Sequence, residues 1–269
     1  MKPTIVTGLF NINREAFEGY KRQWATYLEW FKNCLSLDCD LVTFVDEGME
    51  KFIEANRNFP TKVIPIKLSE FRLYRHVDKM QEVMNSRKFK AKVTDPIAPE
   101  VTRPLYNVVT YSKVSMMKMA ADLNPFNGDY FIWIDAGCMH DRFLPRYKGI
   151  RFPNDDRLSL LNHDKIYMTC YKKPMPQDRN LAEYLCTNPP GKKRRLTAFI
   201  IGSNKNNLAP FEDFLDAYLD ETLSINLVDS EQLAFNNYYL KNPEKFDLCM
   251  FHPKTTWFTG FINLIEEIK

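Results

Sequence analysis

Glycine-rich nucleotide-binding motifs are absent from this sequence. It holds only 9 glycines in 269 residues, with no G-x-G-x-x-G and no G-x-x-x-x-G-K-[ST]. The first absence disfavours an NAD-dependent Rossmann enzyme, and the second disfavours a kinase or an NTPase. G-x-S-x-G and H-E-x-x-H are absent too, which removes the usual signals of an α/β-hydrolase and a zinc metalloprotease.

Long apolar runs and closely paired cysteines are also missing. No stretch approaches the roughly 18 consecutive apolar residues of a membrane span. The start of the chain, Met1-Lys2-Pro3, lacks the apolar region and cleavage site of a signal peptide. The six cysteines show no C-x-x-C spacing and most lie in apolar surroundings, as buried free thiols do. We expect a cytoplasmic protein without a transmembrane segment, for which peripheral association with a membrane stays open.

Composition favours one globular α/β domain over residues 1–269. Hydrophobic residues make up 45% of the chain and charged residues 26%, which is typical of a folded domain. The net charge of +3 is small. It neither requires nor excludes a polyanionic partner.

Short apolar runs alternate with amphipathic stretches along most of the chain. Continuous apolar character predicts strands covered on both faces, and alternation with helices predicts a mostly parallel central sheet flanked by helices. Pro65 places its strand at an edge. The expected strands are 4–10, 41–45, 62–66, 129–135, 166–170, 197–201 and 247–251. The expected helices are 17–31, 105–123, 210–223 and 230–240.

Residues 69–104 differ from the rest of the chain. They are rich in lysine and arginine and contain Pro96, Pro99 and Pro104 near their end. We interpret them as a helical excursion followed by an irregular loop, in the place of a mobile flap over a site.

Asp135 is the strongest single signal for a site. It ends the buried run 130–134 and is followed by Ala136 and Gly137. The carboxyl ends of strands in open α/β sheets face the ligand crevice. A carboxylate there could hold a hard divalent cation that bridges phosphates. Capping of the following turn is the structural alternative.

Four segments together resemble the bacterial HtrL/YibB family, which includes WlaTC-like proteins and is described by inference as glycosyltransferases. The resemblance runs along most of the chain and is weakest at 69–104 and 140–196. It implies a GT-A-like fold and a nucleotide-sugar donor, with a UDP-sugar favoured. The acceptor would be a glycan or a lipid-linked precursor in polysaccharide biosynthesis. The segments are 4–12, 106–113, 130–137 and 229–232.

The resemblance also departs from the GT-A pattern. Those enzymes commonly carry Asp-x-Asp at this strand end, whereas this chain has Asp135-Ala-Gly137. Dependence on Mn²⁺ or Mg²⁺ is therefore in question. Either Asp135 acts with a distant ligand, for which His252 is the candidate, or lysine and arginine neutralise the phosphates. A histidine bonded to backbone is the structural alternative for His252.

The resemblance further implies a set of donor-binding residues. Phe10, Asn11 and Arg14 would hold base and ribose, Asp46 would accept a hydrogen bond from either, and Lys113 would meet the diphosphate. A solvated lysine on a helix face is the structural alternative for Lys113. The whole donor-binding set is Thr7, Phe10, Asn11, Arg14, Asp46, Lys113, Asp135 and Gly137.

Asp229-Ser-Glu-Gln232 opens an expected helix. An acid at this place in GT-A enzymes often faces the acceptor, so Asp229 or Glu231 would act as the general base of an inverting enzyme. Capping of the helix, by Asp229 or Ser230, is an equal alternative.

Two other functions stay open. The basic run 192–195 and the positive charge permit a hydroxylated base in DNA as acceptor. The replacement of the second acid by Gly137 permits a non-catalytic domain that binds nucleotide sugar or a partner. Salt-sensitive DNA binding would favour the first, and donor hydrolysis without acceptor would argue against the second.

Overall fold

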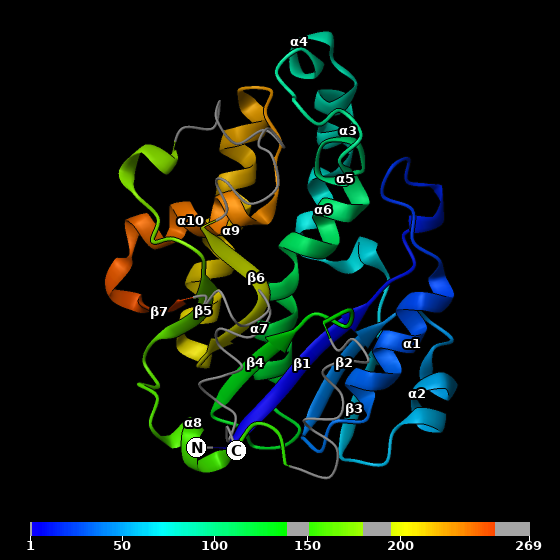
Figure 1. Ribbon diagram of the computed structural model, residues 1–269, viewed down its shortest axis with the longest axis vertical. Helices are drawn as coiled ribbons and strands as arrows, with labels where there is room; N and C mark the ends of the chain where they lie inside the picture. The colour runs from blue at the N-terminus through cyan, green and yellow to red at the C-terminus, as the bar shows by residue number, and fades with distance from the viewer. Residues whose placement is uncertain (1, 139–150, 180–194, 251–269) are drawn as a thin grey trace.

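Seven strands form one sheet in the order β3-β2-β1-β4-β6-β5-β7 within a computed structural model that describes residues 2–138, 151–179 and 195–250 (Figure 1). Each lies within one or two residues of an expected strand, because continuous apolar runs mark strands buried on both faces. The strands are β1 (Pro3–Leu9), β2 (Leu41–Val45), β3 (Thr61–Pro65), β4 (Tyr130–Ile134), β5 (Ile166–Cys170), β6 (Leu196–Ser203) and β7 (Phe246–Met250).

The sheet is mostly parallel, as the sequence predicted for an α/β fold. Strands β3, β2, β1 and β4 run in one direction, and β5 pairs with β7 in parallel. Strand β6 is antiparallel to both β4 and β5, which the sequence did not indicate. Pro65 lies on the edge strand β3, where its missing N–H costs no ladder hydrogen bond.

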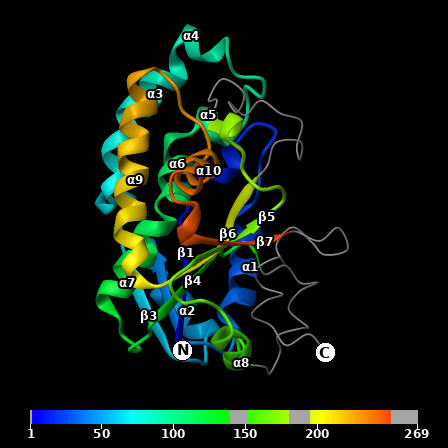
Figure 2. The same ribbon diagram turned by 90° about the vertical axis from the view of Figure 1, so that its left-hand side faces the viewer.

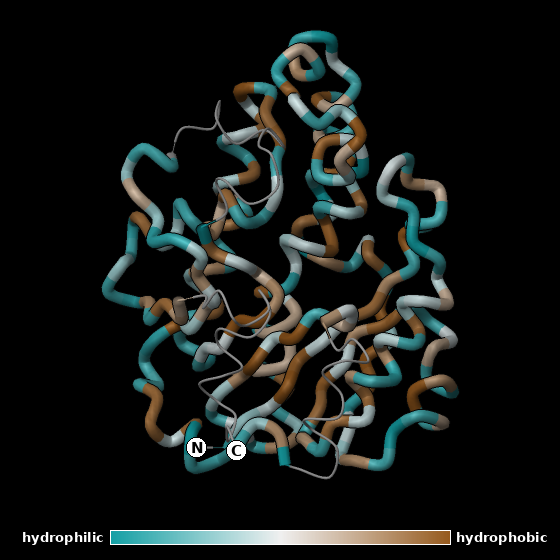
Figure 3. The backbone as a smooth tube through the Cα atoms, viewed as in Figure 1, coloured by the Kyte–Doolittle hydropathy of each residue, from teal (hydrophilic) through white to brown (hydrophobic). Residues whose placement is uncertain are grey.

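Helices cover both faces of the sheet (Figure 2). One face carries α1 (Trp24–Leu35), α2 (Glu50–Asn56) and α8 (Asp155–Ser159), and the other carries α7 (Lys113–Leu123), α9 (Lys205–Ser224) and α10 (Glu231–Lys241). Alternate strand residues therefore enter two cores. Ile132 packs into the α1 core and Trp133 into the α7 core. Figure 3 shows the hydrophobic residues gathered along the central strands.

Two expected helices have different limits. The helix expected from Phe17 begins only at Trp24, because Gly19 adopts a left-handed conformation that interrupts helical geometry. A short turn, η1 (Arg14–Ala16), precedes it. The stripe over 105–123 is divided at Ser112 into α6 (Pro104–Tyr111) and α7.

The excursion after β3 is largely helical, and in Figure 1 it stands beyond the end of the sheet toward which β1 runs. It leads from the edge strand to α6. Its elements are η2 (Leu68–Glu70), η3 (Arg72–His76), α3 (Val77–Asn85), α4 (Arg87–Lys90) and α5 (Pro99–Thr102). Elsewhere lie η5 (Pro176–Arg179) and η7 (Pro243–Lys245).

The described cysteines Cys34, Cys39, Cys138, Cys170 and Cys249 are buried free thiols. Among the helices in the described ranges, none combines the length and the apolar character needed to cross a bilayer.

Candidate functional site

A cavity of about 330 Å³ opens where β1 and β4 end. The loop after β1 and the turn after β4 form its base, α1 forms one wall, and α6 with the start of α7 forms another. Its lining includes Phe10, Asn11, Arg14, Arg22, Trp24, Tyr27, Trp30, Tyr106, Val109, Thr110, Lys113, Trp133, Asp135, Gly137 and Phe199. The carboxyl ends of parallel strands therefore lead into a ligand-sized hollow, as in other open α/β sheets.

Lys113 and Asp135 line this cavity and form a charged group with Glu231, which lies behind them outside the lining; the three are here called the pocket triad. Lys113 Nζ lies 3.0 Å from Asp135 Oδ1 and 3.5 Å from Glu231 Oε1. It also donates to the carbonyl oxygen of Ala198 at 3.0 Å. Trp133 Nε1 donates to Asp135 Oδ1 at 2.6 Å. The ammonium thus has three acceptors, which matches its three N–H bonds.

The pocket triad holds two carboxylates for one ammonium, and all three side chains are largely buried. Their exposed fractions are 5% for Lys113, 22% for Asp135 and 7% for Glu231. Burial alone would lower the pKa of Lys113, but Asp135 and Glu231 outweigh it and raise that pKa above the ordinary lysine value. Burial raises the pKa of Asp135, against the opposing effect of Lys113. The lysine is therefore a fixed cation, and the excess negative charge lies on the carboxylates.

A further carboxyl group, on Glu100 of α5, belongs to the same electrostatic neighbourhood. Burial raises its pKa to about 7, and the charges of Glu231 and Asp229 add to the effect while Arg14 opposes it. Asp229 itself is buried, and its Oδ1 accepts from the backbone N–H of Ser230 at 2.7 Å. The start of α10 and the end of the excursion thus meet as a set of acids beside the cavity.

The loop before α1 and the first turns of α1 supply an aromatic wall. The guanidinium of Arg22 lies over the rings of Trp30 and Tyr27, at 4.7 Å and 5.3 Å from their centroids. Arg22 also donates to Tyr27 Oη at 3.2 Å. A Cβ added at Gly137 would lie 3.4 Å from Trp30 Cε3, so the turn after β4 packs directly on this wall.

Arg14 faces the wall from the loop after β1. Its guanidinium carbon lies 5.0 Å from the centroid of the Phe17 ring and 5.1 Å from that of Tyr106. Within the described ranges its guanidinium donates one hydrogen bond, to the carbonyl oxygen of Tyr20, at a long 3.5 Å. Aromatic rings on two sides therefore fix the plane of the guanidinium.

Most of the expected donor-binding residues come together around this cavity. Phe10, Asn11, Arg14, Lys113, Asp135 and Gly137 all line it. Thr7 does not. It is buried in the sheet, where its hydroxyl donates to the carbonyl oxygen of Ile134 at 2.7 Å. Asp46 is absent from the lining as well, and its Oδ2 accepts from the backbone N–H of Asn11 at 2.7 Å, which holds the loop after β1.

The two expected catalytic acids occupy different positions. Glu231 contacts Lys113 of the pocket triad. Asp229 stays outside the cavity lining, and Tyr111 Oη donates to its carbonyl oxygen at 3.1 Å. Ser230 occupies the N-cap of α10 without a side-chain capping bond. Asp229 Oδ1 bonds the N–H of Ser230, so the acid does satisfy one free backbone group at this helix start.

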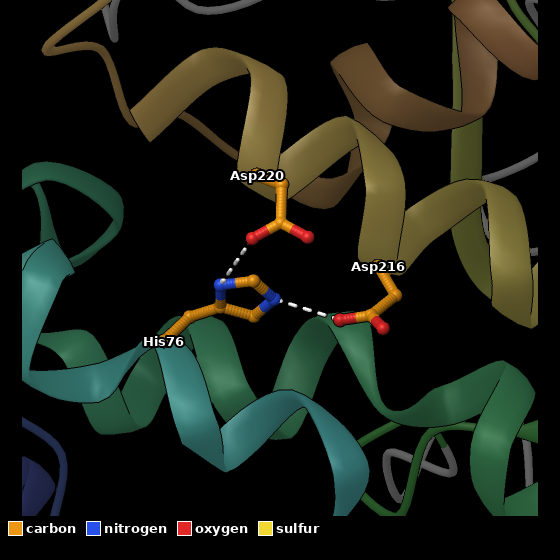
Figure 4. Close-up of side chains that lie close together, drawn as sticks. All are labelled: His76, Asp216 and Asp220. Carbon is orange, nitrogen blue, oxygen red and sulfur yellow. Dashed lines mark hydrogen bonds and ion pairs between the residues drawn. The ribbon is translucent and has the colours of Figure 1, made fainter. Parts of the chain in front are cut away.

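The metal prediction rests partly on His252, which lies outside the described residues. Around Asp135, the described side chains do not fit a divalent cation, because the Lys113 ammonium already occupies the space between Asp135 and Glu231. Elsewhere in the described ranges, ligand atoms of His76, Asp216 and Asp220 lie within 4.8 Å of one another (Figure 4).

That second group is a network of ion pairs rather than an open cation site, and we call it the α9 clamp. Its central carboxylate, Asp216, accepts from His76 Nε2 at 2.8 Å, Arg72 Nε at 2.8 Å and Arg75 Nε at 3.0 Å. Two guanidiniums therefore stand where a metal would need open ligands. The clamp consists of Arg72, Arg75 and His76 from η3 with Asp213, Asp216 and Asp220 from α9.

Sequence reasoning missed several lining residues. The spacing of Trp24 and Tyr27 predicted only an apolar helix face, yet both rings line the cavity. Arg22 stands just before that helix and gave no signal of its own. Phe199 enters from β6, whose antiparallel direction the sequence did not indicate. The aromatic content of 14% was the one available hint.

The fold is that of an α/β protein with a mostly parallel sheet, and the cavity lies at the carboxyl edge of that sheet. More specifically, the chain belongs to the bacterial family of unknown function HtrL_YibB, which it matches over residues 1–264. No curated protein matches it. Among solved structures, apo mouse xyloside xylosyltransferase 1 is similar with a TM-score of 0.45 and 13% identity, over 98% of this chain and 92% of that one.

Proposed function

We propose that this chain is a glycosyltransferase that binds a nucleotide-sugar donor in the cavity at the ends of β1 and β4. The observation that carries the proposal is the cavity itself: a hollow of about 330 Å³ with an aromatic wall, two arginines at its sides and a buried carboxylate at the end of β4. Its volume falls within the roughly 300–1,000 Å³ of small-molecule sites. Aromatic faces suit a base or sugar ring, and guanidiniums suit phosphates.

The acids beside the cavity supply the other half of the reaction. The hydroxyl oxygen of the acceptor attacks the anomeric carbon of the donor, the hydroxyl proton passes to a carboxylate, and the nucleoside diphosphate leaves. Glu231 and Asp229 at the start of α10 are the proposed bases, and of the two only Glu231 belongs to the pocket triad. We favour a UDP-sugar as donor and a glycan or lipid-linked hydroxyl as acceptor.

Lys113 has a different part in this proposal from direct binding. Its three acceptors Asp135, Glu231 and the Ala198 carbonyl already engage the ammonium. It holds the carboxylate of Asp135, which lines the cavity, next to that of Glu231 behind it. Neutralisation of the leaving phosphates falls to other cations.

A thermal-shift screen tests the proposal. UDP-, GDP-, CMP- and dTDP-sugars are each added with Mn²⁺, with Mg²⁺ or with chelator, because a ligand that binds only the folded state raises the melting temperature. A shift with one nucleotide family supports the transferase and fixes the base. Loss of that shift with chelator would bring a metal back to Asp135. Absence of any shift contradicts the donor assignment and favours a non-catalytic domain.

A further inference from the structure

Arg14 and Arg22 line the cavity, yet neither forms an ion pair with any described carboxylate. Two other arginines of the described ranges have their N–H bonds taken up by protein groups. Arg195 pairs with Asp178 at 2.8 Å, and buried Arg57 donates to the carbonyl oxygens of Leu35 and Leu37 at 2.7 Å. Cations that line a cavity without an anion of their own are suited to an anionic ligand.

The two arginines are prepared for such a ligand in the same way. Rings of Phe17 and Tyr106 flank the Arg14 guanidinium, and rings of Tyr27 and Trp30 lie against that of Arg22. Stacking occupies the faces of a guanidinium and leaves N–H bonds at its edge. Arg14 Nε is buried without any hydrogen-bond partner, which is costly unless a ligand supplies one.

The backbone holds both arginines at one place in the structure. The N–H of Arg22 donates to the carbonyl oxygen of Arg14 at 3.3 Å, and that of Phe17 donates to the same oxygen at 3.2 Å. The intervening loop therefore closes on itself and presents the two side chains from adjacent backbone positions. The cavity's remaining cation, Lys113, has its N–H bonds engaged by the pocket triad and Ala198.

We propose that Arg14 and Arg22 bind the diphosphate of the donor between them, in place of the role first assigned to Lys113. In this subsection the pair is called the clamp; it is distinct from the α9 clamp. This inference rests on the proposed function, because it assumes a nucleoside diphosphate in the cavity. Each guanidinium offers a planar fork of N–H bonds that matches phosphate oxygens. During transfer the same two cations would stabilise the negative charge that develops on the departing diphosphate.

Binding titrations test the clamp without knowledge of the acceptor. The tightest of UDP, GDP, CDP and dTDP is titrated by calorimetry into the full chain and into Arg14→Gln, Arg22→Gln and Arg22→Lys. Its parent nucleoside and inorganic pyrophosphate serve as further probes. Arg87→Gln is the matched control, because this substitution removes the same charge from an exposed position on α4 that does not line the cavity.

Each glutamine variant should bind the nucleoside diphosphate about tenfold or more weakly, since a charge-assisted bond is lost. Nucleoside binding and the Arg87→Gln variant should stay unchanged. Arg22→Lys should retain part of the affinity, because a point charge replaces a fork. Since Arg22 is exposed, its variants keep the test valid if Arg14→Gln fails to fold.

The outcomes separate the clamp from the proposed function. Unchanged diphosphate affinity in both glutamine variants would overturn the clamp and leave the donor assignment standing. Pyrophosphate binding that both variants weaken, without any nucleotide binding, would uphold the clamp and overturn the donor. Wild-type protein that binds neither nucleotide nor pyrophosphate would overturn both.

Discussion

The pocket triad and the α9 clamp are two charged clusters built in opposite ways. In the triad, one buried cation, Lys113, lies between the carboxylates of Asp135 and Glu231. In the α9 clamp, one buried carboxylate, Asp216, accepts from two guanidiniums and a histidine. The pKa values move accordingly: burial raises that of Asp135, whereas His76 and Arg75 overcome burial and lower that of Asp216.

This difference separates a cluster suited to chemistry from one suited to stability. Asp216 keeps its charge over a wide pH range and ties η3 to α9. Asp135 carries negative charge in excess of its local cation, next to a cavity. Perturbed carboxylates in clefts are characteristic of functional sites, whereas paired ones also occur in structural networks. The predictions below are ordered by their expected effect on the free energy of unfolding.

Replacement of Lys113 by methionine should give the largest effect. It removes the central cation of the pocket triad and leaves two buried carboxylates side by side, which costs about 3–5 kcal/mol in comparable buried pairs. Urea unfolding at pH 7 measures the change. Lys118→Met on the same helix is the control, because Lys118 forms a surface pair with Asp122 at 2.7 Å. That pair contributes only about 0.3–0.5 kcal/mol.

A loss below about 1 kcal/mol for Lys113→Met would be no larger than that of a surface pair. It would contradict the view that Lys113 balances two buried charges in the pocket triad. It would mean that Asp135 or Glu231 takes up a proton and needs no counter-ion.

Replacement of Asp216 by asparagine should lower the free energy of unfolding somewhat less, by about 3 kcal/mol, because the α9 clamp loses its buried charge but retains an acceptor oxygen. Asp213→Asn is the matched control. The Asp213 carboxylate pairs with Arg72 and is mostly exposed, so this substitution should cost under about 1 kcal/mol of stability. Urea unfolding of both variants gives the difference. A melting temperature that Mn²⁺ raises in wild type but not in Asp216→Asn would show instead that the clamp holds a metal.

Glu100 gives a prediction about pH. Its pKa in the folded protein is about 7, above the ordinary value of 4.5, chiefly because of burial. A raised folded pKa means that the folded state binds the proton more tightly than the unfolded state. Its contribution to stability is therefore present below pH 4.5 and is lost as pH rises to 7.

Glu100→Gln should remove this dependence and make the protein more stable than wild type at pH 8, by about 1–3 kcal/mol. Unfolding curves at pH 5 and pH 8 measure it, with exposed Glu54→Gln on α2 as the control. An equal pH dependence in wild type and Glu100→Gln would show that the carboxyl group is as well solvated as a surface glutamate.

The sequence predicted the strands of the sheet better than the limits of the helices around it. Strands such as Leu41–Val45 and Tyr130–Ile134 are continuous apolar runs, so local composition was enough to find them. The start of α1 was misplaced because the aromatic spacing continues back to Phe17, whereas the left-handed Gly19 interrupts the helix before Trp24. Backbone conformation at such turns competes with periodicity and leaves no periodic signal.

The site divides in the same way. Asp135 was found because its place follows from one strand and the general position of ligands in α/β sheets. The contact of Lys113 with Glu231 depends on how α7, α10 and the antiparallel strand β6 pack together. Arg22 became a candidate only when the structure showed it lying against the rings of Tyr27 and Trp30. Tertiary packing determines these relations, and short sequence windows do not contain them.

Replacement of Asp135 by asparagine should have the smallest effect on stability and the most informative effect on function. Asparagine retains an acceptor oxygen for Trp133, and Lys113 keeps Glu231 and the Ala198 carbonyl. The triad becomes charge-balanced, so the free energy of unfolding should change by less than about 1 kcal/mol. With an identified donor, turnover should fall about 100-fold, because a charge aligned with the reacting groups is removed.

Urea unfolding and the rate of donor turnover are measured together on Asp135→Asn, with Asp216→Asn as its opposite. Asp216→Asn should lose stability and, once folded, turn over donor at the wild-type rate, because the clamp is outside the cavity lining. A loss of about 3 kcal/mol in Asp135→Asn would make Asp135 a structural acid like Asp216. Full turnover by Asp135→Asn would remove it from the site. Only a stable variant with little turnover keeps the two clusters as different as their charges imply.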